Sequence, residues 1–352
     1  MTQPLSVTGW DIGGANIKAV RLDRAKDGRE TWKSASLPFP MWKDADRLEA
    51  ALSLMGEELG AAPDSPLALT MTAELADVFR TKREGVAFVC EAVKRTFPRA
   101  RILALDLSTG GWSPIEAAED RPLDFAANNW LASALYLAPR HADVLFMDVG
   151  STTTDIIPLK DGAVLARGRT DMDRLTSGEL VYTGVLRTNP NTLAPFIPVR
   201  GLPCRTAAEW FASMADVHLL LGRITAAEYS CPTADGAGVS PEECARRLAR
   251  VVCADSEMLR PFEISGMARS LYERQLGRIA EALHQVLSAR EDEGMPTLLA
   301  AGGGAFLVRD LGARLGLPTA DPLPSPDPEA LAVFPALAAA SLLADHIGKT
   351  SP

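Results

Sequence analysis

Hydrophobic residues in the first 140 positions follow two different spacings. Short apolar runs at residues 7–12, 17–23 and 30–37 are bounded by small or polar residues, which predicts strands. Residues 44–59 carry leucine and methionine three and four positions apart, the spacing of one helix face. The same reading predicts strands at residues 66–71 and 102–105 and helices at residues 83–97 and 123–137. Strands followed by strand–helix alternation are typical of a mixed sheet covered by helices.

The second half of the chain repeats this order. Strands are predicted at residues 144–149, 155–159, 163–167 and 298–301, and helices at residues 242–253, 264–289, 306–315 and 329–344. Residues 170–240 are rich in glycine, proline and threonine and show little periodicity, so we expect an irregular insert there. The chain therefore divides into two α/β domains, residues 1–140 and 141–352. The last helix either packs back on the first domain or covers only the second.

The stretch LFMDVGSTTTDIIPL, residues 145–159, predicts a β-hairpin. Its turn is built from small residues whose N–H groups and hydroxyls could converge on an anion. Asp148 ends the first strand, where a carboxylate can hold a divalent cation. Alternatively, Asp148 is a turn residue that hydrogen-bonds nearby backbone N–H groups. The phosphate-binding candidates in this turn are Gly150, Ser151, Thr152 and Thr153.

A second stretch, VTGWDIGGANIKAVRL at residues 7–22, has the same plan. Asp11 precedes Asp148 by 137 positions, about the length of one domain, and Gly13 then aligns with Gly150. This repeat predicts two hairpins that grip one phosphate chain from both sides, with Mg²⁺ held by Asp11 and Asp148. The phosphate-binding candidates here are Asp11, Gly13, Gly14, Asn16 and Lys18.

A third small-residue turn, Gly302, Gly303 and Gly304, follows an apolar strand and precedes a helical pattern. Three such turns in this order resemble the actin/Hsp70/sugar-kinase superfamily, where they are called phosphate 1, phosphate 2 and adenosine. The resemblance implies two actin-like, ribonuclease H-like domains around a central cleft. One departure is that Gly14 and Asn16 stand where kinases of this superfamily usually carry hydroxyl residues, which weakens the case for ATP phosphoryl transfer.

Composition and charge narrow the classes of partner. The chain is 47% hydrophobic and carries a net charge of −9 without a basic block, which argues for a globular protein and against a nucleic-acid surface. No apolar run reaches transmembrane length, and the first residues lack the features of a signal peptide. We therefore expect a cytoplasmic protein without a membrane partner.

The five cysteines do not suggest a disulfide framework, because their number is odd and no signal peptide is evident. Cys231, Cys244 and Cys253 with His218 could form a metal site, but their spacings match no standard zinc pattern. We expect packed thiols instead.

Further candidate residues follow the strand at residues 66–71. In open α/β sheets ligands bind beyond the carboxyl ends of strands, so Thr72 and Glu74, with Lys82 close behind, are expected to face the cleft. The alternative is a solvated glutamate and lysine at a helix start. Asn129 and Trp130, near the start of a predicted helix, offer the cleft an amide and a flat apolar wall, or else a simple cap.

The segment RGRTDMDRLTSGELVYTGVLR, residues 167–187, concentrates charge without helical or strand periodicity. Its arginines could pair with neighbouring carboxylates for structure alone, or could fork onto a phosphate group. Irregular loops held by a scaffold commonly carry sites, which favours the second interpretation. The substrate-binding candidates here are Arg174, Glu179, Tyr182 and Arg187.

Seven segments together sharpen the resemblance. They are WDIGGANIKAV, MTAELADVFRTKREGV, NNWLASA, DVGSTTTDIIP, TSGELVYTGVLRT, PTADG and AAGGGAFL. They are similar to the hydantoinase A/oxoprolinase group of the superfamily, and MTAEL with GELVYTGVLRT resembles its branch linked to tetrahydromethanopterin-dependent C1 transfer. That branch includes the synthase of methylofuran biosynthesis. A hydantoinase name in this group follows the fold and does not by itself imply hydantoin cleavage.

The resemblance implies a transferase that joins a furan-methyl diphosphate to the phenol oxygen of γ-glutamyltyramine and releases diphosphate. Stabilising the charge of the leaving diphosphate is then the main task, and the hairpins of Asp11 and Asp148 with Mg²⁺ would perform it. A phenol with a pKa near 10 also needs a base or a nearby cation, for which Glu74 and Lys82 are the candidates. Gly302, Gly303 and Gly304 would line the substrate pocket.

Three other functions stay open from the sequence. The first is an ATP-dependent small-molecule kinase, and the second is an ATP-dependent amide hydrolase of the hydantoinase/oxoprolinase type. The third is a non-catalytic nucleotide sensor with the same fold. The sequence assigns neither the use of ATP nor the oligomeric state.

Overall fold

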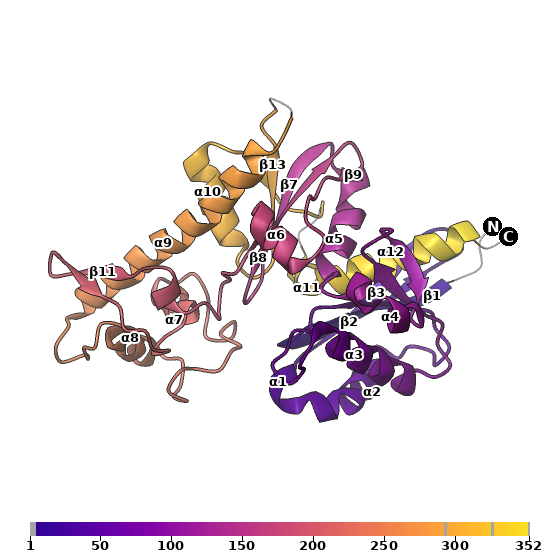
Figure 1. Cartoon of the computed structure of the whole chain (residues 1–352), viewed down its shortest axis with the longest axis horizontal. Coiled ribbons are helices and arrows are strands. Elements are labelled where there is room, and N and C mark those ends of the chain that lie inside the picture. The colour runs from indigo at the N-terminus through magenta and orange to yellow at the C-terminus, as the bar shows by residue number, and fades with distance from the viewer. Residues whose placement is uncertain (1–4, 292–293, 325–326, 351–352) are drawn as a thin grey trace.

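A six-stranded mixed sheet occupies the first half of the chain, in the order β3-β2-β1-β4-β5-β6. β1, β2 and β3 form an antiparallel meander, whereas β4 and β5 join in parallel because longer, helix-containing connections precede them. The strands are β1 (Leu5–Ile12), β2 (Asn16–Arg24), β3 (Glu30–Pro38), β4 (Leu67–Met71), β5 (Ile102–Asp106) and β6 (Gly111–Pro114). The computed structural model describes residues 5–291, 294–324 and 327–350 (Figure 1). Residues 1–4, part of the stretch without signal-peptide features, lie outside these ranges.

Two of the three helices predicted in the first half differ from the structure at their starts, whereas the helix predicted at residues 83–97 is confirmed to within one residue. The helices of the first half are α1 (Met41–Asp44), α2 (Leu48–Leu59), α3 (Lys82–Thr96), α4 (Ala117–Asp120) and α5 (Asn129–Leu137). The helix expected from residue 44 is split, because a 3-10 turn (Ala45–Arg47) separates α1 from α2. The helix expected from residue 123 starts only at α5, because Ala127 has a φ of 48°, which a right-handed helix excludes.

The second sheet has the strand order β10-β8-β7-β13-β14, with β9 paired to β8. Its strands are β7 (Asp143–Val149), β8 (Thr154–Lys160), β9 (Ala163–Val164), β10 (Leu180–Val181), β13 (Thr297–Ala301) and β14 (Thr319–Ala320). β7 and β8 form the predicted antiparallel hairpin, and β13 runs parallel to β7. The strand expected at residues 163–167 is shorter than predicted, since only β9 pairs there. α10 (Ala305–Leu315) follows β13 and packs on the sheet.

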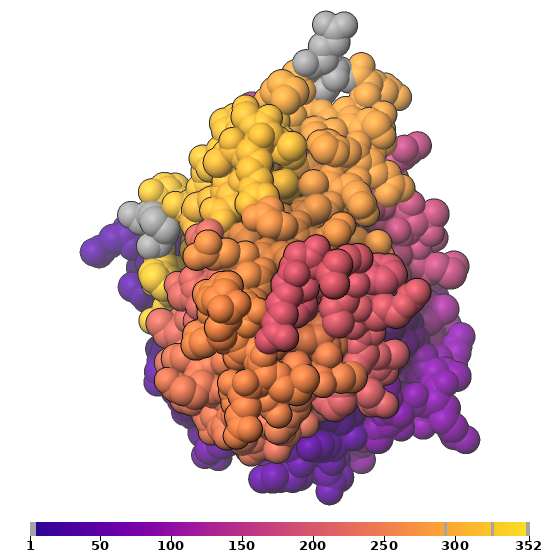
Figure 2. All heavy atoms as spheres, turned by 90° about the vertical axis from the view of Figure 1, so that its left-hand side faces the viewer, coloured from indigo at the N-terminus to yellow at the C-terminus, as the bar shows by residue number. Residues whose placement is uncertain are grey.

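The insert is more ordered than its composition predicts. It contains α6 (Asp171–Ser177), the hairpin of β11 (Phe196–Val199) and β12 (Leu202–Arg205), and α7 (Met214–Leu220). α8 (Pro241–Arg250) and the 28-residue α9 (Pro261–Ser288) follow, and α9 packs against α7, α8 and β11. Figure 1 shows α9 running from the second sheet out to these elements. In Figure 2 the insert and α9, pink to orange, cover the centre of the face in view, with the indigo first half below and behind.

The last helix packs on the first sheet. α11 (Pro328–Ala332) and α12 (Phe334–Thr350) replace the single helix expected at residues 329–344, and α12 contacts β1, β2, β4 and α5. A Cβ on Gly9 would lie 2.1 Å from the carbonyl oxygen of Ala336, so the alanine-rich face of α12 lies directly on β1. One core cluster joins α12 to residues of both sheets, such as Val7 and Phe146. Among the described residues, no helix is long and apolar enough to cross a membrane.

The close contact between Gly9 and α12 predicts that a methyl group added at Gly9 destabilises the fold. Gly9→Ala should lower the free energy of unfolding by about 1–3 kcal/mol, because the new Cβ forces α12 away from β1. The matched control is Gly277→Ala in α9, where a Cβ meets no atom within 4 Å and alanine should stabilise the helix by about 1 kcal/mol. Urea denaturation of both variants measures the difference. Equal stability of the Gly9→Ala variant and the wild type would contradict the packing of α12.

Candidate active site between two hairpins

The two hairpin turns have the same internal hydrogen bond. The N–H of Gly13 donates to the carbonyl oxygen of Asn16 at 2.9 Å, and the N–H of Gly150 donates to that of Thr153 at 2.9 Å. The alignment of Asp11 with Asp148 predicts this equivalence, which the hydrogen bonds confirm. A Cβ on Gly13 would lie 2.8 Å from the Asn16 oxygen, so this turn excludes a side chain.

Carboxylates from both hairpins lie close enough to one another for their charges to interact. The pKa of Asp148 is raised to about 6 by burial and by the charges of Asp155 and Asp11, against the opposing effect of Lys18. Burial also raises the pKa of Asp11, again opposed by Lys18. Asp155 faces Asp148 directly in the register of β7 and β8. Because Lys18 of the first hairpin acts on carboxylates of both, the two hairpins meet at one charged cluster.

The polar contacts of the two aspartates differ. Asp11 is 5% exposed and accepts long hydrogen bonds from Thr70 Oγ1 at 3.5 Å and Asn129 Nδ2 at 3.4 Å. The half-buried Asp148 accepts no hydrogen bond from any residue that the structure describes. The alternative prediction was that Asp148 accepts hydrogen bonds from N–H groups of the turn. No such hydrogen bond is found among the described residues.

This set of donors fits a magnesium ion that is shared with a phosphate ligand. Mg²⁺ prefers oxygen ligands and commonly takes only one or two carboxylates, with phosphate oxygens and water completing the shell. Asp11 and Asp148 supply two such carboxylates, and a cation between them would relieve their repulsion. The described residues contain no group of three or more His, Cys, Asp or Glu that could hold a metal by themselves.

The alternative cysteine site is not assembled in the described structure. His218 is buried, and its Nε2 lies 2.9 Å from Gln275 Oε1. Cys244 is buried beside Arg247, whose guanidinium donates to its sulfur at 3.4 Å, and Cys253 is exposed. All five cysteines are free thiols, but the expectation of packed thiols is wrong for the exposed Cys253.

The loop at residues 182–188 presses on the second turn. The N–H of Val185 donates to the carbonyl oxygen of Gly150 at 2.9 Å, and those of Leu186 and Arg187 donate to that of Ser151. A Cβ on Gly184 would lie 2.5 Å from the Thr152 nitrogen, so only glycine fits at this approach. The TSGELVYTGVLRT segment therefore packs directly behind the second hairpin turn.

Arg187 also reaches the first hairpin through Trp42. Its guanidinium carbon lies 4.6 Å from the centre of the Trp42 ring, which belongs to α1. α1 is tied to the first turn, because the N–H of Met41 donates to the carbonyl oxygen of Gly14 at 2.9 Å. The cation–π contact therefore joins the surroundings of the two turns. Sequence reasoning identified Arg187 but not Trp42.

The third glycine turn lies against the second hairpin. A Cβ on Gly302 would lie 2.3 Å from Asp148 Oδ1, and one on Gly304 would lie 2.4 Å from the Val149 side chain. These two glycines are therefore explained by close packing on the end of β7. A Cβ on Gly303 would have only the Val185 side chain nearby, at 3.7 Å. Phe306, just beyond the turn, stacks edge-on against His218 at 5.2 Å between ring centres.

Glu74 and Lys82 form the predicted pair beyond β4. The Nζ of Lys82 lies 3.7 Å from Glu74 Oε1 and 2.6 Å from Asp171 Oδ2 in α6. Burial raises the pKa of Glu74 to about 7 although Lys82 opposes this shift. Glu74 Oε2 has no hydrogen-bond partner among the described residues. A carboxyl group with a pKa near 7 is suited to accept a proton at neutral pH.

A short segment connects this pair with the first hairpin. The backbone N–H of Ala127 favours the charged form of Glu74, and Asn129, two residues later, contacts Asp11. Thr72 borders the first turn, since its Oγ1 lies 3.4 Å from the position of a Cβ on Gly13. Glu74, Thr72 and Asn129 therefore lie around the same edge of the first sheet as Asp11.

Other candidates have contacts that explain them structurally. Arg174 is 1% exposed and donates to Asp155 Oδ1 at 2.8 Å, and its guanidinium stacks 4.2 Å from the Trp130 ring. Its ion pair is with Asp155, whereas the sequence suggested a neighbouring carboxylate. Glu179 accepts the N–H groups of Arg167 and Gly168. Tyr182 is 65% exposed.

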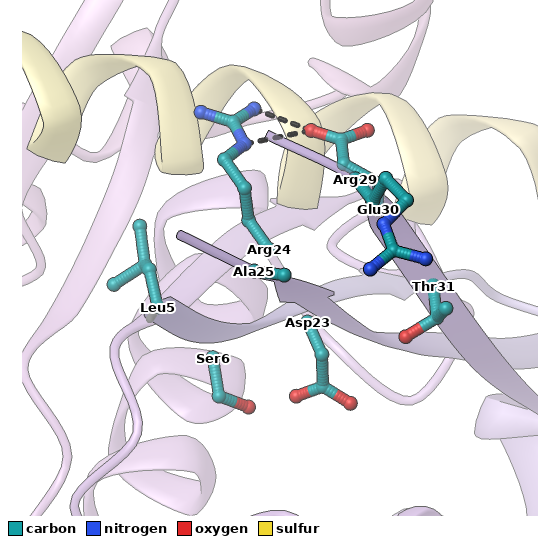
Figure 3. Close-up of a pocket in the computed structure, with 8 residues that line it drawn as sticks. All are labelled: Leu5, Ser6, Asp23, Arg24, Ala25, Arg29, Glu30 and Thr31. Carbon is teal, nitrogen blue, oxygen red and sulfur yellow. Dashed lines mark hydrogen bonds and ion pairs between the residues drawn. The ribbon is translucent and has the colours of Figure 1, made fainter. Parts of the chain in front are cut away.

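A surface hollow lies elsewhere on the first sheet. Its volume is about 580 Å³, and Arg24, Arg29, Glu30 and Thr31 are among the residues that line it (Figure 3). Arg24 there donates to Glu30 at 2.8 Å and to Asp345 at 2.7 Å. The hollow lies at the end of β1 and β2 opposite the first turn, because Leu5 pairs with Arg24 there. None of the predicted site residues lines it.

Comparison with known proteins places the chain in a family. The model of the family described as hydantoinase/oxoprolinase matches residues 67–346. The chain belongs to this family. A relative from Methanocaldococcus jannaschii is 41% identical over 79% of this chain and 80% of its own length. Another, from Methanococcus vannielii, is 33% identical over 47% of this chain and 73% of its own length.

Both relatives carry the same name, (4-{4-[2-(gamma-L-glutamylamino)ethyl]phenoxymethyl}furan-2-yl)methanamine synthase. The similarity to named synthases supports the prediction of an enzyme. A nucleotide-free structure of acetone carboxylase, from work on ATP-dependent acetone carboxylation, covers 88% of this chain and 68% of its own with a TM-score of 0.54. The two sequences are only 11% identical, so this similarity supports the actin-like fold of the chain and nothing further.

The charged cluster predicts that Asp148→Asn stabilises the fold at high pH. Because the pKa of Asp148 is raised to about 6, its buried charge destabilises the fold above that pH and has no effect once it is protonated in both states. We expect the variant to gain about 1–2 kcal/mol at pH 8 and almost nothing below about pH 3, where the carboxyl group is protonated in the folded and the unfolded state. It should also lose the thermal stabilisation by Mg²⁺ and inorganic diphosphate together. Calorimetric melting measures both effects, with Asp64→Asn at an exposed position as control.

A lower melting temperature of the Asp148→Asn variant at pH 8, with the ligand effect retained, would show that Asp148 is an ordinary turn residue.

Proposed function

We propose that this protein joins a furan-methyl diphosphate to the phenol oxygen of γ-glutamyltyramine and releases diphosphate. The observation that carries the proposal is the 41% identity to a synthase whose name describes a furan bound through a phenoxymethyl ether to a γ-glutamylaminoethyl group. The two facing phosphate-type hairpins support a diphosphate as the leaving group. The proposed reaction is an alkyl transfer, and it would be a step in the biosynthesis of the cofactor methylofuran.

The proposed step exchanges one C–O bond for another. The phenol oxygen attacks the furan-methyl carbon, the bond from that carbon to the diphosphate oxygen breaks, and the electron pair leaves with the diphosphate. The phenolic proton goes to a base on the protein. No oxidant, reductant or nucleotide is needed, because the diphosphate ester supplies the leaving group.

The hairpins would bind the leaving group. Backbone N–H groups in the turns, the hydroxyls of Ser151 and Thr152 and the ammonium of Lys18 are suited to phosphate oxygens. Asp11 and Asp148 would hold Mg²⁺, which when bound would neutralise charge on the diphosphate. Donors fixed in place before the reaction stabilise the developing charge without reorganising, which is commonly the largest catalytic effect.

Glu74 would take the phenolic proton. Its carboxyl group has a raised pKa of about 7, caused mainly by burial, so it can be unprotonated at neutral pH and still attract a proton. Lys82 beside it would stabilise the carboxylate or the developing phenolate. Arg187 and the turn of Gly303 are the candidates for holding the aromatic parts of the substrates. Trp130 was predicted to offer a flat wall to the cleft, but it is buried in the core, with Arg174 stacked on its ring.

An ATP-dependent kinase or amide hydrolase is the second candidate. The actin-like fold favours it, because proteins of this fold commonly bind nucleotides at the equivalent turns. Gly14 and Asn16 in the first turn weigh against it, since they lack the hydroxyls usual in the kinases. A nucleotide sensor without turnover is the third candidate.

A direct assay tests the proposed reaction. The purified protein, Mg²⁺, the furan-methyl diphosphate and γ-glutamyltyramine are incubated without ATP, and mass spectrometry follows the ether. We expect ether and inorganic diphosphate in equal amounts. Ether formation or hydrolysis only with ATP would favour the second candidate, and ATP binding without turnover of any substrate would favour the sensor.

Replacing the proposed base predicts a large loss of rate. Glu74→Gln should lower kcat by about 10²–10⁴-fold, because the amide cannot accept the phenolic proton. In the wild type, kcat/KM should fall about tenfold per pH unit below pH 7, as Glu74 becomes protonated. The control is Glu91→Gln, on the exposed face of α3, the helix that carries Lys82. An unchanged pH profile in the Glu74→Gln variant would exclude Glu74 as the base.

A further inference from the structure

Lys82 lies between two carboxylates that come from opposite halves of the molecule. Its Nζ is 2.6 Å from Asp171 Oδ2 in the second half and 3.7 Å from Glu74 Oε1 in the first. The Glu74 side chain is 1% exposed, whereas those of Lys82 and Asp171 are each 26% exposed. The ammonium thus makes its short ion pair with the more exposed carboxylate. The buried carboxylate that the proposed reaction needs keeps an oxygen, Oε2, without a hydrogen-bond partner among the described residues.

Asp171 is held in place by its helix. It is the first residue of α6, whose start is closed by a capping box between Thr170 and Asp173. Arg174 in the same helix is buried, donates to Asp155 of the second hairpin and stacks on Trp130. The Asp171 carboxylate is therefore fixed relative to both the second hairpin and α5. Lys82, at the end of a flexible side chain, adapts to it.

We propose that Asp171 is a positioning residue that holds the Lys82 ammonium away from Glu74, so that the Glu74 carboxylate stays free to take the phenolic proton. This rests on the proposed function, because it assigns Glu74 as the base. Lys82 paired tightly with Glu74 would make Glu74 a weaker base. In the arrangement described, Asp171 competes for Lys82 and leaves Glu74 Oε2 open.

The charges around Glu74 determine in which direction the pKa of Glu74 changes when Asp171 is replaced. The groups that act on its carboxyl are Lys82 in α3, Asp171 in α6, its own backbone N–H and that of Ala127. Removing the Asp171 charge takes away a repulsion, which lowers the pKa of Glu74. It also leaves Glu74 as the nearby partner of Lys82, which lowers that pKa again. Both changes therefore lower the pKa of Glu74.

The test is the pH profile of kcat/KM for Asp171→Asn. We expect the acid limb to move about one pH unit lower than in the wild type, with a lower kcat at its plateau, because the base is weaker. Asp171→Glu should keep a profile close to that of the wild type. Asp173→Asn is the matched control, because it weakens the cap of the same helix without touching Lys82. An acid limb that stays in place or moves higher in Asp171→Asn would overturn the proposal.

A second measurement does not require turnover. Carbon NMR of the carboxyl group of Glu74, identified by its loss in Glu74→Gln, follows its titration directly. Asp171→Asn should lower the midpoint, and Lys82→Met should remove most of that effect if Asp171 acts through Lys82. An equal effect with and without Lys82 would contradict the positioning role. If the wild type forms no ether, the proposed function fails, while the titration still decides how Asp171 acts on Glu74.

Discussion

The site depends on the repulsion between carboxylates that two hairpins bring together. Asp148 feels the charges of Asp155 and Asp11, which Lys18 opposes, and Arg174 forms an ion pair with Asp155. Keeping such charges buried destabilises the fold unless a cation joins them. The architecture enforces the arrangement, because the two hairpins are strands of separate sheets that α12 and one shared core hold together. A site that is unfavourable when empty is suited to binding a metal and a polyanion at once.

The same charges are arranged to serve two different tasks. Around the hairpins, negative charge is left in excess, and in the proposed reaction this excess would attract Mg²⁺ together with the diphosphate. Beyond β4, Lys82 is shared between Glu74 and Asp171, so the charge there is nearly balanced and one carboxyl group has a pKa near 7. The separation of a charge-binding region from a proton-accepting one is what the proposed ether synthesis requires.

Much of the fold could be predicted from the sequence, because strand and helix spacing are local properties. The hairpins with Asp11 and Asp148 were predictable from their repeated pattern, and their shared turn hydrogen bond confirms it. Helix starts were predicted less well where one residue interrupts the helix, as at Ala127. The insert was expected to be irregular, yet α6 and α7 form there, since capping boxes and tertiary packing favour short helices that composition does not indicate. The position of Asp155 opposite Asp148 could be predicted from the hairpin register. The contacts of Trp42 with Arg187 and of Asp171 with Lys82 could not, because they join residues from different halves of the chain and leave no local sequence pattern.

The central claim is that one diphosphate with Mg²⁺ binds between the two hairpin turns. A crystal structure of the protein with Mg²⁺ and inorganic diphosphate tests it most directly. The account predicts the metal between the carboxylates of Asp11 and Asp148, and phosphate oxygens against the N–H groups of both turns. Diphosphate bound in the hollow beside Arg24, or at one turn with no metal between the two aspartates, would contradict it.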